Sequence, residues 1–103
     1  MAHQYRELLA YVADQDGNIS VELITLTRNG LSYYFQDKRW RRPYSMFFND
    51  VCTNDSGDSL KIAPLTRHST PSWVSLEQVV ISDSAKDRYE KWNKGNRGSS
   101  SIT

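Results

Sequence analysis

The chain has 103 residues, which is enough for one small domain and too short for two independent cores. Hydrophobic residues make up 38% and aromatic residues 12%, which suffices for a thin, aromatic-rich core, while a net charge of +1 argues against coating nucleic acid through bulk electrostatics. Cys52 is the only cysteine, which excludes an internal disulfide, and no apolar run approaches the ~18 residues that span a bilayer. We therefore expect a soluble cytoplasmic protein.

The first third of the chain predicts a helix followed by a β-hairpin. HQYRELLAYVA, residues 3–13, carries apolar residues at helical spacing, and the DQDGN cluster at 14–18 would end that helix. Residues 19–27 alternate apolar and polar side chains and are rich in β-branched types, which predicts a strand. The Asn-Gly pair at 29–30 is a strong hairpin signal that favours positive φ at both positions, so residues 31–36 form the return strand.

The rest of the chain predicts short strands and a second helix. The charged segment KRWRR, at 38–42, leads into a strand that Pro43 opens, because a residue without an N–H group suits the first position of a strand. Strands separated by polar loops are predicted at 43–51, 59–66 and 73–82. DSAKDRYEKWNK, residues 83–94, begins with helix-starting residues and predicts a short helix. GNRGSSSIT after it has the composition of a frayed tail.

The predicted order of elements is a helix, about five short strands and a helix. In a chain of this length, short strands with tight turns predict an α+β, mainly β fold. The form that we expect is a small SH3-like barrel or a strongly bent antiparallel sheet, with an open α+β sheet as the alternative. We expect residues 1–95 to form a single compact domain and residues 96–103 a flexible C-terminal tail.

The sequence offers little support for a metal site or a catalytic nucleophile. His3 and His68 are the two histidines, and neither has a ligand spacing such as HxxxH. Cys52 with His68 is a conceivable nucleophile–base pair, but the flanking residues carry no motif of such a site. The five glycines are dispersed, so no glycine-rich phosphate loop is formed. We expect neither a metal nor another cofactor.

A basic and aromatic run at 38–44 is the strongest functional signal. Between residues 28 and 42 there are five cations against one acid, a local charge of +4. Arginine forks pair with phosphate oxygens and aromatic faces stack on unpaired bases, which are the contacts that a single-stranded nucleic acid needs. The candidate binding residues are Lys38, Arg39, Trp40, Arg41 and Tyr44. The alternative is structural: a solvated run of arginines before a strand that places Phe47 and Phe48 in the core.

A second set of motifs runs from residue 42 to residue 82. In chain order these are Arg42-Pro43 before a hydrophobic strand, Asn49-Asp50 at its end, Pro64-Leu65-Thr66, and Leu76-Glu77-Gln78. In this order the set resembles the MazF/PemK family of toxin–antitoxin endoribonucleases. The chain departs from the family pattern in its N-terminal segment, and it has only residues 67–75 where the family carries a hairpin.

The resemblance implies an SH3-like barrel that forms a homodimer and cuts single-stranded RNA without a metal. It also implies catalytic roles for two residues. Arg42 would stabilise the negative charge of the phosphorane, and Thr66 would orient the phosphate by hydrogen bonding. An arginine stays protonated and is a poor general base, so the base stays open, with Glu77 and His68 as candidates.

Functions of different classes stay open on the sequence. The first is the endoribonuclease, acting through Arg42 and Thr66. The second is a non-catalytic barrel that binds RNA or DNA through the run at 38–44. The third is a protein-interaction module, such as a viral or plasmid accessory protein that binds and inhibits a host enzyme, with Trp40 at the centre of its interface.

Overall fold

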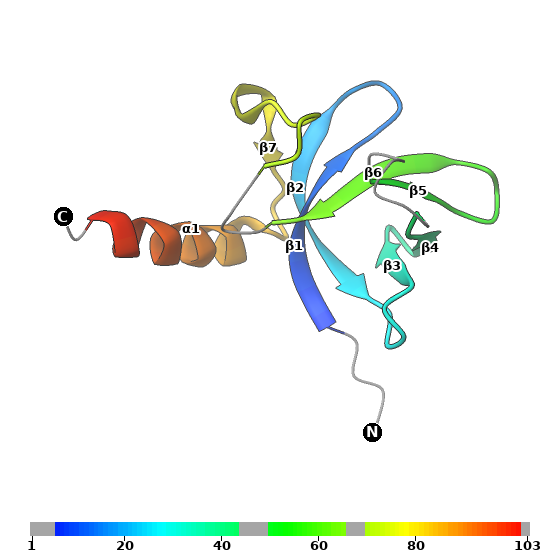
Figure 1. The fold of residues 1–103 in the computed structure, drawn as a ribbon, viewed down its shortest axis with the longest axis horizontal. Helices are drawn as coiled ribbons and strands as arrows, with labels where there is room; N and C mark the ends of the chain where they lie inside the picture. Colours follow the sequence, from blue (N-terminus) through cyan, green and yellow to red (C-terminus); the bar gives the residue numbers. More distant parts are fainter. Residues whose placement is uncertain (1–5, 44–49, 66–69, 102–103) are drawn as a thin grey trace.

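The computed structural model describes residues 6–43, 50–65 and 70–101, and six antiparallel strands among them close into a barrel (Figure 1). The strands are β1 Arg6–Ala13, β2 Ile19–Leu26, β3 Ser32–Phe35, β4 Lys38–Arg41, β5 Val51–Thr53 and β6 Ser59–Pro64. Their order is β1-β6-β5-β4-β3-β2, and the pairing of β1 with β2 closes the ring. The predicted mainly-β barrel is thus confirmed.

The β1–β2 hairpin contains the first and the last strand in the order of the barrel sheet. Its two strands pair along their full length, and the second half of β1 also pairs with β6. The free edge of β2 serves two neighbours. Its Leu26 end pairs with β3, and its Val21 end pairs in parallel with the short strand β7, Val80–Ile81. Strand β2 is therefore long enough to pair with both β3 of the barrel and β7 of the C-terminal segment.

The segment predicted as an N-terminal helix is strand β1, and this prediction is wrong. Ala10 and Val12 belong to the barrel interior, whereas Leu9 and Tyr11 belong to a second cluster under the C-terminal segment. A strand that is buried on both faces lacks the polar and apolar alternation that marks a half-exposed strand. Its apolar residues then fall at spacings that also suit a helix.

Two loops with the same hydrogen-bond pattern close the β1–β2 and β5–β6 hairpins. In DQDGN, residues 14–18, and in NDSGD, residues 54–58, the N–H of the first residue donates to the carbonyl of the fifth at 3.1 Å. The side-chain Oδ1 of the first residue also accepts two backbone N–H groups of its own loop. The turn predicted at 14–18 is confirmed, although it joins two strands.

The Asn-Gly signal at 29–30 marks the β2–β3 turn, as predicted, and the Gly30 N–H donates to the Thr27 carbonyl at 2.9 Å. Of this pair only Gly30 has a positive φ, 76°, so the turn is not the two-residue form that the signal favours. That form occurs instead between β3 and β4. Gln36 and Asp37 there have φ values of 57° and 62°, without a glycine to mark the turn in the sequence.

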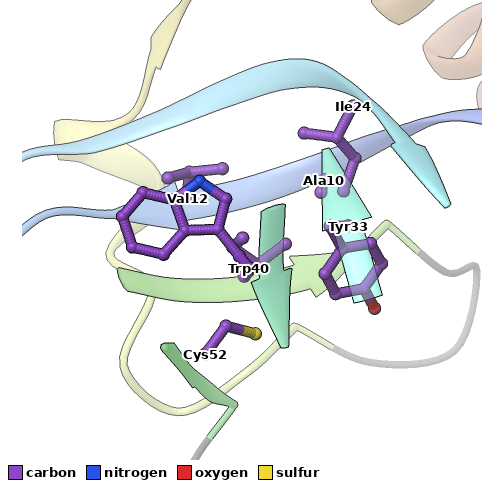
Figure 2. Close-up of a cluster of buried hydrophobic side chains, with 7 residues drawn as sticks. Ala10, Val12, Ile24, Tyr33, Trp40 and Cys52 are labelled. Carbon is purple, nitrogen blue, oxygen red and sulfur yellow. The ribbon is translucent and has the colours of Figure 1, made fainter. Parts of the chain in front are cut away.

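Buried side chains from all six strands fill the barrel: Ala10, Val12, Ile24, Tyr33, Trp40, Cys52 and Ile62. Figure 2 shows the Trp40 indole reaching from β4 toward Val12 on β1, with Cys52 coming from β5. The indole Nε1–H donates to the Phe35 carbonyl at 3.1 Å. A small barrel needs large side chains to fill its interior, and Trp40 supplies the largest of them.

The C-terminal segment covers the outer face of β1 and β2. Leu9, Tyr11 and Val21 are buried there together with Ala85. Partly buried around them are Leu23, Leu65, Trp73, Val74, Val79, Ile81, Tyr89 and Trp92. This second layer lets a chain of this length bury strands on both faces. Figure 1 shows α1, Lys86–Ser101, and β7 on the side of the barrel away from β3 and β4.

The other predictions for the second half of the chain have mixed outcomes. The strand at 59–66 is confirmed as β6, and the helix at 83–94 as α1, which continues through residues expected to belong to a frayed tail. Of the strand predicted at 73–82, Val80–Ile81 form strand β7, and Leu76–Gln78 form the 3₁₀ helix η2. The strand at 43–51, with Phe47 and Phe48, lies mostly outside the described residues.

The division of the chain into a domain at 1–95 and a flexible tail at 96–103 stays a prediction. Within the described ranges, no helix is both long and apolar enough to cross a membrane.

Candidate nucleic-acid interface

The charged run at 38–42 is part of the barrel wall, because most of it forms β4 rather than a lead-in to a strand. Its side chains alternate. Trp40 turns inward opposite Tyr33, while Arg39 is exposed opposite Tyr34. The pleat of β4 therefore divides the run between the core and the surface.

The prediction that Trp40 offers an exposed face to a base or a protein partner is wrong. Its side chain is only 3% exposed, and its indole N–H is bound to the Phe35 carbonyl. Directly opposed residues in an antiparallel pair point to the same face, so Trp40 shares the interior with Tyr33. The aromatic contact expected at this position is not available in the folded barrel.

Two of the predicted binding cations are paired with carboxylates of the β5–β6 loop. Arg41 Nη2 lies 2.6 Å from Asp55 Oδ1, and Lys38 Nζ lies 3.9 Å from Asp58 Oδ2. All four side chains are at least half exposed, so each ion pair is screened and contributes little to stability. The local charge counted along the sequence misses these acids, because the pairing of β4 with β5 brings them to the cations.

Arg42 ties the β2–β3 turn to the end of β4. Its Nη1–H donates to the Gly30 carbonyl at 2.8 Å, and its Cζ lies 5.6 Å from the centroid of the Tyr33 ring. Its side chain is still exposed. Thr66 and Tyr44 lie outside the described residues, so the closeness of Arg42 to Thr66 and the binding role of Tyr44 stay predictions.

A polar hollow beside Arg39 is a feature that the sequence did not indicate. It has a volume of about 410 Å³ and is lined by Thr27, Arg28, Asn29, Ser32, Tyr34 and Arg39. Among the described residues that line it, there are two arginines and no carboxylate. Tyr34, a residue that is 38% exposed, contributes an aromatic side chain. The hollow thus combines a cationic lining with an accessible aromatic side chain.

Strand register explains why these residues lie together. Tyr34 stands opposite Thr25 on β2 and opposite Arg39 on β4, so the three outward side chains form one row. Arg28 joins them from the β2–β3 turn. In the sequence, Arg28 contributes only to the local charge, and no motif marks Tyr34. The register of the hairpin is the signal from which both could have been found.

A second hollow, of about 350 Å³, is lined by residues of the β1–β2 loop, β5, β6 and Trp73. Trp73 Nε1–H donates to Asp50 Oδ2 at 3.0 Å, and Lys61 Nζ lies 5.8 Å from the centroid of the Trp73 ring. Both the polar group and the ring face of Trp73 therefore contact the barrel. We interpret this cluster as an anchor for the C-terminal segment.

Cys52 is unsuited to nucleophilic chemistry. Its side chain is fully buried, and this burial raises the pKa of its thiol to about 12. The thiol therefore stays protonated at neutral pH, and the thiolate is the reactive form. His68, the partner weighed for it, lies outside the described residues. In the described part of the chain, no three His, Cys, Asp or Glu side chains gather into a group that could hold a metal ion.

Fold and surface together define a small, closed antiparallel β-barrel protein whose outer wall carries exposed arginines on one side. Comparison with protein-family models, curated proteins and solved structures found no match for the chain. The barrel is consistent with the fold that the MazF/PemK resemblance implies, and membership of that family stays a prediction.

Proposed function

We propose that the protein binds single-stranded nucleic acid on the outer wall formed by β2, β3 and β4. The observation that carries this proposal is the hollow in which Arg28 and Arg39 lie beside Tyr34. Guanidinium groups pair bidentately with phosphate oxygens, and stacking of a base on an aromatic ring is worth ~1–3 kcal/mol. Small β-barrels commonly use a strand face and its flanking loops to bind oligonucleotides.

The position of the hollow favours a single strand over a duplex. A tyrosine ring stacks only on a base whose face is free, which a paired and stacked duplex does not offer. The low net charge of +1 leaves little bulk attraction for the denser charge of a duplex. The row of Thr25, Tyr34 and Arg39 also lies beyond the part of the wall that the C-terminal segment covers.

The test is fluorescence anisotropy with a labelled mixed-sequence oligonucleotide across a range of salt concentrations. The variant Arg28→Ala/Arg39→Ala should bind more weakly. The negative slope of log K against log salt should become shallower by about 1.4, because each phosphate contact on a single strand contributes about −0.7. Lys91→Ala/Lys94→Ala is the matched control, since it removes two exposed positive charges from α1.

Equal weakening in both variants would show that only total charge matters and would refute the assignment of the hollow. No binding by the unmodified protein at low salt would refute the proposed function and favour the protein-interaction alternative.

The metal-independent endoribonuclease that the resemblance implies is the second candidate. It is favoured by the closed barrel and by the exposed Arg42 side chain at the end of β4. Labelled single-stranded RNA incubated in EDTA should then be cut, and Arg42→Ala should abolish cutting while circular dichroism shows a retained fold. Sedimentation should show the homodimer that the resemblance implies. Cleavage that persists in Arg42→Ala would exclude the catalytic role of this residue.

A further inference from the structure

The β5–β6 loop places carboxylates against the cations that flank the proposed site. Lys38 and Arg41 lie on either side of Arg39 along β4. Asp58 contacts the first of them and Asp55 the second, at 3.9 Å and 2.6 Å. Arg41 shares the outward face of Arg39, and Lys38 is exposed at the start of the strand next to Arg39 in the chain. Both of these cations are therefore paired with acids of the same chain.

Asn54 fixes the backbone of the loop and the side chain of Asp58. Asn54 Oδ1 accepts the backbone N–H groups of Ser56 and Asp58 at 3.0 Å and 2.9 Å, and Asn54 Nδ2 donates to Asp58 Oδ2 at 3.2 Å. Gly57 supplies the positive φ, 87°, that the loop requires. These hydrogen bonds fix the loop backbone and hold the Asp58 carboxylate, so Asp58 needs little further ordering to pair with Lys38.

We infer that Asp55 and Asp58 determine specificity by masking Lys38 and Arg41 from polyanions. This inference rests on the proposed binding of a single strand at Arg28, Tyr34 and Arg39. A phosphate that approaches a masked cation must displace a carboxylate and is repelled by it. A single strand in the hollow keeps its stacking contact and its two arginine contacts. A duplex depends more on charge and loses more from the mask.

The experiment compares Asp55→Asn/Asp58→Asn with Asp83→Asn/Asp87→Asn. Each variant removes two exposed carboxylates that pair with cations, and the control pairs, Asp83 with Lys86 and Asp87 with Lys91, lie at 3.6 Å and 3.7 Å. An Asn at 58 keeps an oxygen that can accept the hydrogen bond from Asn54.

The unmasked variant should bind the labelled single strand roughly 2- to 30-fold more tightly, the range expected for releasing two exposed ion pairs. Its salt slope should steepen by about 1.4 on a single strand and about 1.8 on a duplex. Its affinity for duplex should rise by the larger factor, so the preference for a single strand narrows. Adding Lys38→Ala/Arg41→Ala to the unmasked variant should remove the gain.

Each outcome decides between the inference and the proposed function. The masking role is refuted if the gain in oligonucleotide affinity is no larger than in the control variant. It is also refuted if the gain persists when both Lys38 and Arg41 are replaced. Binding by the unmasked variant but not by the unmodified protein would refute the proposed function and, with it, the role of the two carboxylates in specificity. Binding by neither refutes both, and binding by the unmodified protein with no change in the variant refutes the mask alone.

Discussion

Replacement of Trp40 by phenylalanine separates a core role of this residue from a binding role. The side chain is 3% exposed, and its indole N–H donates to the Phe35 carbonyl at 3.1 Å. Loss of that hydrogen bond and a slightly underfilled interior should together cost about 1–3 kcal/mol. In a domain of this size, 1 kcal/mol lowers Tm by about 4–8 °C, so Trp40→Phe should lower Tm by about 4 °C or more.

The assay pairs thermal melts followed by circular dichroism with oligonucleotide anisotropy. Tyr34→Leu serves as the reciprocal variant, because it changes the outer wall and not the interior. Its stability should change by no more than about 0.5 kcal/mol, while its affinity for a single strand should fall roughly 5- to 150-fold. Trp40→Phe should show the opposite pattern. An unchanged Tm with lost binding in Trp40→Phe would refute the assignment of this residue to the core.

Further predictions concern a backbone position, a buried thiol and a turn. Asp50→Ala should lower the free energy of unfolding in urea by about 2–4 kcal/mol, because it loses the hydrogen bond from Trp73 and places alanine at a φ of 64°. Asp50→Asn should lower it by under about 1 kcal/mol. Equal losses of stability in the two variants would contradict this explanation. The folded-state pKa of Cys52 is raised from 9.0 to about 12, so the stability that its neutral thiol contributes is complete below pH 9 and is lost as the pH rises toward 12. The stability difference between the protein and Cys52→Ala should therefore shrink over that window, and a constant difference would argue against the burial. Asp37→Gly should stabilise the β3–β4 turn by about 0.5–1 kcal/mol, since glycine adopts the observed φ of 62° without strain. A lower Tm of the variant in thermal melts would refute this prediction.

The parts of the fold that the sequence predicts correctly depend on local signals. Strand β2 alternates because its neighbours leave polar positions partly exposed, and Gly30 marks the turn after it. Strand β1 was not predicted because its second face is buried by residues far away in the sequence, such as Tyr89 and Trp92. The turn at 36–37 carries no glycine, so its two left-handed residues follow from the strands that it joins.

The candidate site depends on information that is not local. A run of cations and an aromatic ring at 38–42 looks like one surface, yet the pleat sends Trp40 inward, and only the pairing with Tyr33 shows this. Asp55 reaches Arg41 through a strand pairing across fourteen positions. Arg28 and Tyr34 become candidates only once the register of the hairpin is known. The sequence gives the type of each residue, but the face of the barrel on which a residue lies becomes known only from the strand pairing.

The covering of one half of the barrel has a consequence for where a ligand can bind. The C-terminal segment occupies the outer face of β1 and β2 up to Leu23, and the wall beyond it carries Tyr34, Arg39 and Arg41. The segment at 28–42 has five cations and one acid, Asp37, and the β5–β6 loop brings two more acids, Asp55 and Asp58, against it. Charge alone therefore provides weak attraction on the open wall. Any strong binding there must add a directional contact, and Tyr34 is the exposed aromatic side chain that can provide one.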